Sequence, residues 1–198
     1  VERRGLRLLS VWLVVGLGNP GKEYAATRHN VGYLVVDELA SRFGVGLKKH
    51  GRAHADTADA RLGDERVVLL RSRSYMNESG GPVKAAADYA KESVDRIIVV
   101  QDELDIPTGT IRLKAGGGDG GHNGIRSIKK SMGSGDFTRV RVGIDRPPGR
   151  QDPADYVLRS FSSVERRELP SVVSVAADAV EALITDGLAA AQNRFHSE

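Results

Sequence analysis

The stretch VWLVVGLGNPG, Val11 to Gly21, decides the fold because it combines an apolar segment with a glycine-rich turn near the start of the chain. The β-branched run Val11–Val15 predicts a strand. The glycines at 16, 18 and 21 have the Gly-x-Gly-x-x-Gly spacing of loops that bind a dinucleotide pyrophosphate. The stretch is therefore either a nucleotide-binding loop or a tight turn with another purpose.

A nucleotide-binding loop requires a helix that opens within the glycines and an acidic residue at the end of a second strand. Here Asn19-Pro20-Gly21-Lys22 is a turn-forming cluster, and no helical periodicity starts before about Val31. The acid at a suitable separation, Asp37, lies inside that helical pattern. We therefore interpret the glycines as a tight exit from the first strand, which delivers Asn19 to the carboxyl end of a sheet.

Strand-like and helical segments alternate along the chain. Strands are expected at Val11–Val15, Ala53–Arg61, Val67–Leu70, Ile97–Val100, Gly109–Lys114 and Val140–Ile144. Helices are expected at Val31–Phe43, Pro82–Lys91, Asn123–Met132 and Val172–Ile184. This alternation predicts an α/β fold: a single domain with a twisted mixed β-sheet flanked by helices on both faces.

Turn residues add detail at three places. Asp64-Glu65 is typical of a hairpin turn and predicts an antiparallel portion of the sheet. The proline-rich segment Pro147–Pro153 predicts a loop. Ser162 and Glu165 have capping-box spacing, but Pro170 predicts that the continuous helix begins near residue 170.

Length and composition set the class of protein. A chain of 198 residues with 40% hydrophobic residues can bury one sizeable core. We expect a poorly ordered extension over residues 1–10 and a single domain over residues 11–198. The absence of cysteine excludes disulfides and thiolate metal sites. Since no apolar run approaches the roughly 18 residues that cross a membrane, we expect a cytoplasmic protein with no membrane partner.

The net charge is only +3, but it is unevenly distributed. Thr110–Arg150 contains nine basic residues against three acidic ones, whereas the chain from Gln151 onward contains four basic and eight acidic residues. A basic field on one part of a surface suits a polyanionic partner. A solvated basic face without a partner is the alternative at this point.

Four polar loops end predicted strands or open predicted helices, and they carry Asn19, His29, Asn77, Asp102, His122 and Asn123. A histidine beside a carboxylate suits general-base hydrolysis, because the carboxylate fixes the tautomer while the imidazole takes a proton from water. Asparagine amides can stabilise an oxyanion. A serine nucleophile is disfavoured because neither Ser74 nor Ser79 lies in a Gly-x-Ser-x-Gly elbow.

These motifs together resemble the bacterial peptidyl-tRNA hydrolase family over nearly the whole chain, from about Val11 to Phe195. The resemblance rests on VGLGNPGxxY from Val14, TRHNxG from Thr27, MNxSG from Met76, DELD from Asp102 and GGGxGGHNG from Gly116. It implies hydrolysis of the ester between a peptide and the terminal ribose of tRNA. It also implies that the reaction needs no metal and no cofactor, and that the protein is a monomer that does not bind DNA.

The resemblance implies a role for individual residues. His29 would be the general base, with Asp102 orienting it, while Asn19, Asn77 and Asn123 would hold substrate and water. Tyr24 and Met76 would line the pocket, with His122 supporting it. Lys114 and Arg141, and less strongly Arg112, would bind the phosphates of the acceptor stem, in agreement with the basic segment.

Two other classes of function remain open from the residues alone. An RNA-binding module without catalysis would use the basic surface but would leave the His–Asp pair unexplained. It would also lack the usual stacking platforms, since aromatic residues are 5% of the chain. A nicotinamide-dependent oxidoreductase is disfavoured by the turn at Pro20.

Overall fold

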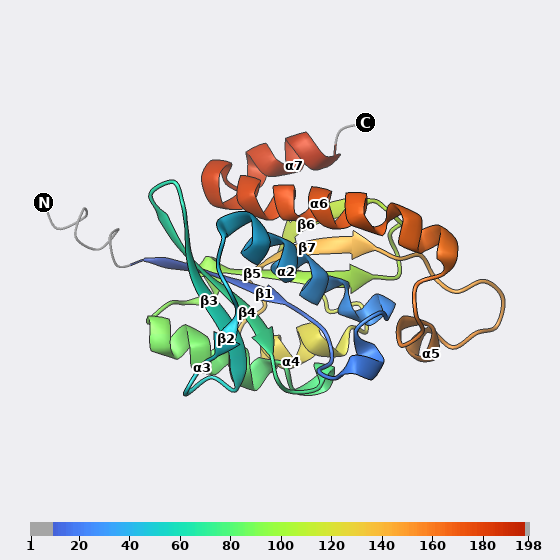
Figure 1. Ribbon diagram of the computed structural model, residues 1–198, viewed down its shortest axis with the longest axis horizontal. Helices are drawn as coiled ribbons and strands as arrows, with labels where there is room; N and C mark the ends of the chain where they lie inside the picture. The colour runs from blue at the N-terminus through green and yellow to red at the C-terminus, as the bar shows by residue number, and fades with distance from the viewer. Residues whose placement is uncertain (1–9, 197–198) are drawn as a thin grey trace, which may run out of the picture.

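A seven-stranded mixed sheet forms the middle layer of the molecule (Figure 1). The computed structural model describes residues 10–196, so the predicted extension over residues 1–10 lies outside this range except for Ser10. The strands, in the spatial order β2-β3-β4-β1-β5-β7-β6, are Lys48–Lys49, Ala55–Leu62, Glu65–Ser72, Val11–Gly16, Ile97–Glu103, Thr138–Gly143 and Ile111–Ala115. β4, β1, β5 and β7 run parallel, while β2, β3 and β6 pair antiparallel. The predicted single-domain α/β fold with a mixed sheet is confirmed.

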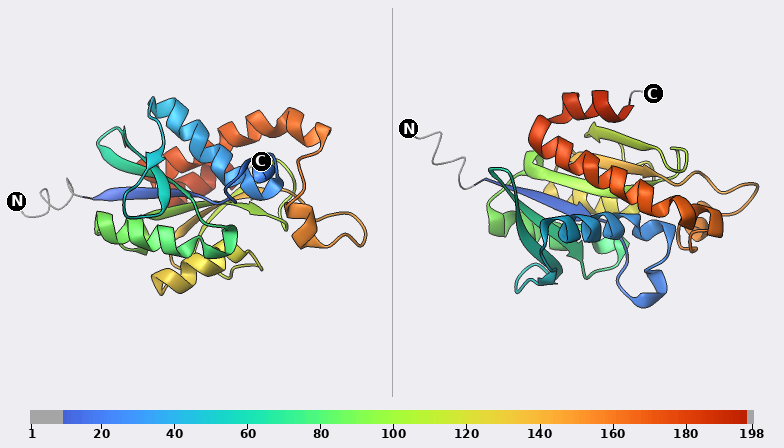
Figure 2. Two further views of the ribbon diagram at one scale, coloured as in Figure 1. Left: turned by 60° about the horizontal axis from the view of Figure 1, so that its bottom comes forward. Right: turned by 45° about the horizontal axis from the view of Figure 1, so that its top comes forward.

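Helices cover both faces of the sheet (Figure 2). One face carries α2, Val31–Phe43, and α6, Ser163–Asp186, with α7, Leu188–His196, beside α6. The other carries α3, Gly80–Ala90, and α4, Asn123–Met132. A short helix, α5, spans Pro153–Val157, and single 3₁₀ turns lie at Lys22–Tyr24 (η1), Arg28–Asn30 (η2), Met76–Glu78 (η3) and Val94–Arg96 (η4).

Alternation along the central strands explains why there are two cores. Val14 of β1 packs with α2 and α6, whereas its neighbours Leu13 and Val15 pack with α3 and α4. β5 divides in the same way, with Ile98 and Val100 on the first side and Ile97 and Val99 on the second. Successive side chains of a strand point to opposite faces, so a strand covered on both faces is apolar throughout.

The opening glycines serve close packing between β1 and α2. A methyl group at Gly16 would lie 2.2 Å from the carbonyl oxygen of Gly32, and one at Gly32 would lie 2.5 Å from both Leu17 N and Val100 O. A methyl at Gly18 would meet the ring of Tyr33 at 2.8 Å. The glycines therefore let the start of α2 reach the carboxyl end of β1, as expected for a tight exit from the strand.

Several boundaries differ from the sequence prediction. α6 begins at Ser163 because the Ser162–Glu165 capping box forms, and Pro170 is accommodated inside the helix. The predicted loop ends in α5, which starts with an Asp152 side-chain cap and Pro153 in the first turn. α7 and β2 were not predicted. No helix within residues 10–196 is long and apolar enough to cross a membrane.

The contact between α3 and α4 depends on one glycine of an adjacent pair. A methyl at Gly80 would lie 2.2 Å from Ser127 O, whereas one at Gly81 meets no described atom within 4 Å. Gly80→Ala should lower the free energy of unfolding by about 1–3 kcal/mol through overpacking. Gly81→Ala should raise it by about 0.5–1 kcal/mol through helix propensity. Urea denaturation of both variants checks this, and equal effects would contradict the close approach.

Candidate active site

A cleft of about 640 Å³ lies at the edge of the sheet where β1, β4 and β5 end. Residues from seven segments line it, namely Asn19, His29, Tyr75, Met76, Asn77, Asp102, Glu103, Leu104, Gly120, Gly121, His122, Asn123, Arg146, Asp152, Pro153, Ala154, Val157 and Leu158. The carboxyl edge of parallel strands is where open α/β sheets place ligands. The cleft therefore contains the polar loops that the sequence places at strand ends.

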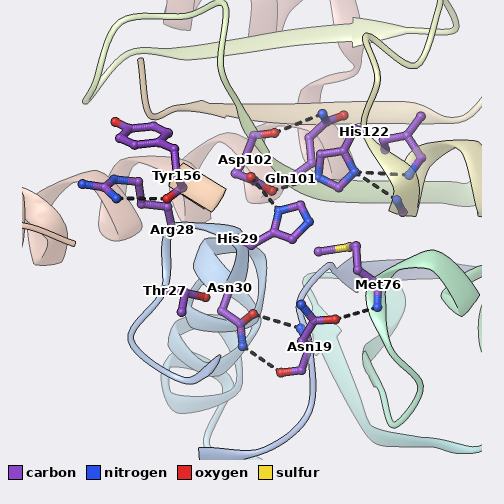
Figure 3. A network of polar contacts seen from close by, with 12 residues as sticks. Asn19, Thr27, Arg28, His29, Asn30, Met76, Gln101, Asp102, His122 and Tyr156 are labelled. Atoms are coloured by element: carbon purple, nitrogen blue, oxygen red, sulfur yellow. Dashed lines mark hydrogen bonds and ion pairs between the residues drawn. The ribbon is translucent and has the colours of Figure 1, made fainter. Parts of the chain in front are cut away.

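Asp102 joins two histidines at the base of the cleft (Figure 3). Its Oδ2 lies 2.8 Å from His29 Nδ1 and its Oδ1 lies 2.8 Å from His122 Nε2. The side chain of Asp102 is 2% exposed and that of His29 is 12% exposed. β5 continues through Glu103, so Asp102 lies within the strand and not in the loop after it.

The tautomer of each histidine follows from its partners. His122 caps α4, because its Nδ1 accepts hydrogen bonds from the backbone N–H groups of Gly124 at 3.1 Å and Ile125 at 3.4 Å. Its Nε2 must therefore carry the hydrogen that it donates to Asp102. His29 donates its Nδ1–H to the other carboxylate oxygen. In neutral His29 the lone pair of Nε2 can therefore accept a proton.

The contact between Asp102 and His29 shifts the pKa of both side chains. Burial alone would raise the pKa of Asp102, but the charges and hydrogen bonds of His29 and His122 hold it well below its usual range. Burial would lower the pKa of His29, but the charge and hydrogen bond of Asp102 raise it above 6.5. Asp102 is thus ionised near neutral pH, and it strengthens His29 as a base.

Asn19 is held on three sides. Its backbone N–H donates to Asn30 Oδ1 and its carbonyl accepts from Asn30 Nδ2, both at 2.9 Å. Its side-chain Oδ1 accepts from Met76 N–H at 2.7 Å. With Oδ1 engaged, the amide NH₂ of Asn19 is oriented toward the cleft, on the side of His29 (Figure 3).

The remaining predicted cleft residues divide into two groups. Met76, Asn77, His122 and Asn123 line the cleft, and the side chains of Asn77 and Asn123 belong to exposed residues at its mouth. Tyr24, which the resemblance places in the pocket, is not among the lining residues. Its ring instead lies edge-on to Tyr75, with centroids 6.2 Å apart, and Tyr75 itself lines the cleft.

Sequence reasoning missed the residues that fix the turn bearing His29. Arg28 is 7% exposed, forms a bidentate ion pair with Glu165 at 2.6 and 3.0 Å, and donates to Tyr156 O at 3.1 Å. Its guanidinium also lies 4.0 Å from the centroid of the Tyr156 ring. Asn30, buried on the other side of His29, was likewise not assigned a role. Their position in the sequence, on either side of His29, was the signal that could have indicated their role in fixing this turn.

The predicted phosphate-binding residues lie outside the cleft on β6 and β7. Arg112 is directly opposite Arg141 in the ladder, and Lys114 is opposite Arg139. Facing residues of an antiparallel pair and residues two apart share one face of a sheet. Burial and the charges of Arg139 and Arg141 lower the pKa of Lys114, so these side chains form one basic cluster.

Three groups in the cleft could offer ligand atoms to a metal. Atoms of His29, Asp102 and His122 lie within 4.8 Å of one another. In the structure each histidine is hydrogen-bonded to one oxygen of Asp102, and the helix cap fixes the ring of His122. The donor set therefore fits a proton-transfer network.

The sequence and the fold are both similar to those of known proteins. A family model described as peptidyl-tRNA hydrolase matches residues 13–198. The chain is 62% identical over 186 residues to the peptidyl-tRNA hydrolase of Frankia casuarinae, covering 94% of each chain. It is 56% identical over 191 residues to that of Streptomyces coelicolor, covering 94% of this chain and 95% of the relative. A crystal structure of peptidyl-tRNA hydrolase from Acinetobacter baumannii matches with a TM-score of 0.88 and 36% identity, covering 94% of this chain and 95% of that chain.

Asp102→Asn should reverse the direction of the pKa shift at His29. The pKa should fall from above 6.5 to below it, because burial of His29 remains while the carboxylate that favours the imidazolium is lost. NMR titration of the imidazole signals measures this. Glu103→Gln, which removes a neighbouring carboxylate that does not bond His29, serves as the matched control. An unchanged titration in Asp102→Asn would contradict the role given to the carboxylate.

Proposed function

The chain belongs to the peptidyl-tRNA hydrolase family of ester hydrolases, and from that premise we propose that His29 is the general base that cleaves peptidyl-tRNA. The bond cleaved is the ester between the peptide and the 3'-terminal ribose of peptidyl-tRNA that has dropped from ribosomes, and its cleavage releases peptide and free tRNA. The observation that carries the proposal is the orientation of His29, whose Nδ1 is bonded to Asp102 while its ring lines the cleft.

The reaction follows from this orientation. Nε2 of neutral His29 accepts a proton from a water molecule as the water oxygen attacks the ester carbonyl carbon. Asp102 stabilises the imidazolium that forms without becoming protonated itself. The tetrahedral intermediate then collapses, the bond between the carbonyl carbon and the ribose oxygen breaks, and that oxygen takes the proton from His29.

The asparagines supply the polar contacts of the reaction. Asn77 and Asn123 line the cleft with amide N–H donors for the oxyanion or the attacking water. The fixed amide NH₂ of Asn19 suits a carbonyl of the first peptide bond. A free aminoacyl group lacks this carbonyl and carries an ammonium, so it is poorly matched to a donor.

The basic cluster of β6 and β7 suits the phosphates of tRNA. Lys114 and Arg141 are each only partly buried, and Arg112 lies beside them. Burial lowers the pKa of Lys114 and of Arg141, and the charges of neighbouring arginines lower it further, so the charge of a bound phosphate would favour both cations. A non-catalytic RNA-binding module would also use this cluster, but it does not account for the Asp102 network.

His29→Ala should reduce the release of an N-acetylated amino acid from tRNA by about 10²–10⁴-fold, because general-base assistance to water is lost. The assay is run in EDTA with wild type, His29→Ala and His50→Ala, whose histidine lies on the ring of Tyr89 outside the cleft. Free aminoacyl-tRNA should be a much poorer substrate. Binding without release by the wild type would favour the RNA-binding module, and release by His29→Ala at the wild-type rate would overturn the proposal.

Lys114→Ala should raise KM for tRNA substrates and weaken its dependence on salt. Each lost phosphate contact should reduce the slope of log KM against log salt concentration by about 0.7–0.9. Arg61→Gln, on β3 in the other half of the sheet, removes one exposed positive charge as a control. Equal slopes for wild type and Lys114→Ala would place the phosphates elsewhere.

A further inference from the structure

Arg139 of β7 is the largest side chain in the molecule's described part that is almost completely buried, at 1% exposed. Its Nε donates to Gln101 Oε1 at 2.7 Å, and its Nη1 donates to Gly118 O at 2.7 Å and to Gly116 O at 3.4 Å. All three acceptors are neutral oxygens, and within residues 10–196 no carboxylate forms an ion pair with it. A buried charge without a carboxylate partner is costly for stability, so its retention needs a reason.

The environment of Arg139 adds to this cost. Burial and the charge of Arg141 lower its pKa, against a smaller opposing effect of Glu103. Lys114 is directly opposite it on β6. An apolar side chain at this position would avoid both the desolvation and the repulsion.

The contacts of Arg139 connect two parts of the cleft. Gln101 precedes Asp102 on β5, and its side-chain Nε2 donates to the backbone oxygen of Asp102 at 3.3 Å. Gly116 and Gly118 belong to the glycine-rich loop, Gly116–Gly121, which leads directly into His122 and Asn123. Arg139 therefore spans from the strand that carries Asp102 to the loop that carries its second histidine.

The other hydrogen bonds of the loop are local to it or exposed, apart from one at its first residue, where Gly116 N–H donates to Phe137 O at 3.1 Å. Gly116, Gly117, Gly120 and Gly121 all have positive φ, so the loop loses much backbone entropy when it orders. Apart from Arg139, its carbonyl oxygens receive a turn hydrogen bond from His122 N–H to Asp119 O at 2.9 Å and an exposed contact from Lys129 Nζ to Gly117 O at 3.1 Å. The contact from Arg139 to Gly116 O is buried and the one to Gly118 O is part-buried, and hydrogen bonds from a charged donor are stronger where water is partly excluded.

We propose that Arg139 is a positioning residue for hydrolysis, which holds the glycine-rich loop against β5 so that His122 and Asn123 keep their places beside Asp102. This inference rests on the proposed function. A direct phosphate contact is not expected for Arg139, because its side chain is 1% exposed and its Nε and Nη1 donate to protein oxygens. Arg139 differs in this respect from Lys114 and Arg141, which are partly exposed.

Two substrates separate positioning from phosphate binding. One is N-acetylated aminoacyl-tRNA and the other is an N-acetylaminoacyl ester of adenosine, which has the same scissile bond but no phosphate. Arg139→Gln should lower kcat/KM by about 10–100-fold on both, since displacement of catalytic groups by about 1 Å costs about this much. Arg139→Lys, which keeps the charge and one donor, should recover part of the loss. Lys114→Ala should lose far more on tRNA than on the adenosine ester.

A second readout does not depend on activity. In Arg139→Gln a displaced His122 donates less to Asp102, so the carboxylate acts more strongly on His29 and the NMR-measured pKa of His29 should rise above that of the wild type. The other charged residues lining the cleft, Glu103, Arg146 and Asp152, are unchanged in this comparison. Arg61→Gln is the matched control for loss of an arginine. If Arg139→Gln fails to fold, the titration is made on Arg139→Lys, for which a smaller rise in the pKa of His29 is expected because it keeps one donor.

The outcomes are distinct. Loss on tRNA alone would overturn the proposal and assign Arg139 to phosphate binding. Unchanged kcat/KM on both substrates, or an unchanged titration of His29, would also overturn it. A wild type that hydrolyses neither substrate would refute the proposed function, while the titration of His29 would still test the position of the loop.

Discussion

The hydrogen bonds from two imidazoles to the carboxylate of Asp102 are the interaction on which the rest of the site depends. Each oxygen of the carboxylate has its own histidine, at 2.8 Å in both cases. Because His122 is also the cap of α4, its ring cannot turn without leaving two helix N–H groups unpaired. The carboxylate of Asp102 is therefore held in one orientation, and its hydrogen bond to Nδ1 fixes the orientation of the His29 ring. A strand, a 3₁₀ turn and a helix start are fixed relative to each other through a single buried charge.

Close backbone approach makes this convergence possible. Gly16 and Gly32 bring the exit of β1 against the start of α2, and Gly80 brings α3 against α4. Without these contacts, Asn19 and His29 on one side and Met76 and Asn123 on the other could not share one cleft. The glycine spacing of the opening stretch is thus a packing requirement. Its similarity to a nucleotide-binding loop arises because both uses need a backbone without Cβ at a strand's end.

The sequence predicted elements whose pattern is local, and it failed where distant partners decide the structure. α2 and α4 match their predicted bounds because apolar periodicity and the flanking residues define them. β5 extends three residues beyond the prediction, through Gln101 and Asp102, because tertiary hydrogen bonds compensate for their burial. The cleft residues His29, Asp102 and His122 were identifiable as polar groups at element ends. The burial of Arg28 and of Arg139 was not predicted, because it depends on partners up to 137 residues away.

Three buried charged side chains, Arg28, Asp102 and Arg139, each lie where a cleft-lining segment meets another part of the fold. Apolar residues of similar volume would give comparable stability at such positions, since desolvation offsets much of the attraction between charges. Apolar packing, however, tolerates small rotations, whereas hydrogen bonds weaken steeply as donors and acceptors become misaligned. Proton transfer from water to a single ring nitrogen depends on orientation more than on contact area. The two apolar cores on either side of the sheet supply the stability, and the buried charges use part of it to hold His29, Asp102 and the glycine-rich loop in one alignment.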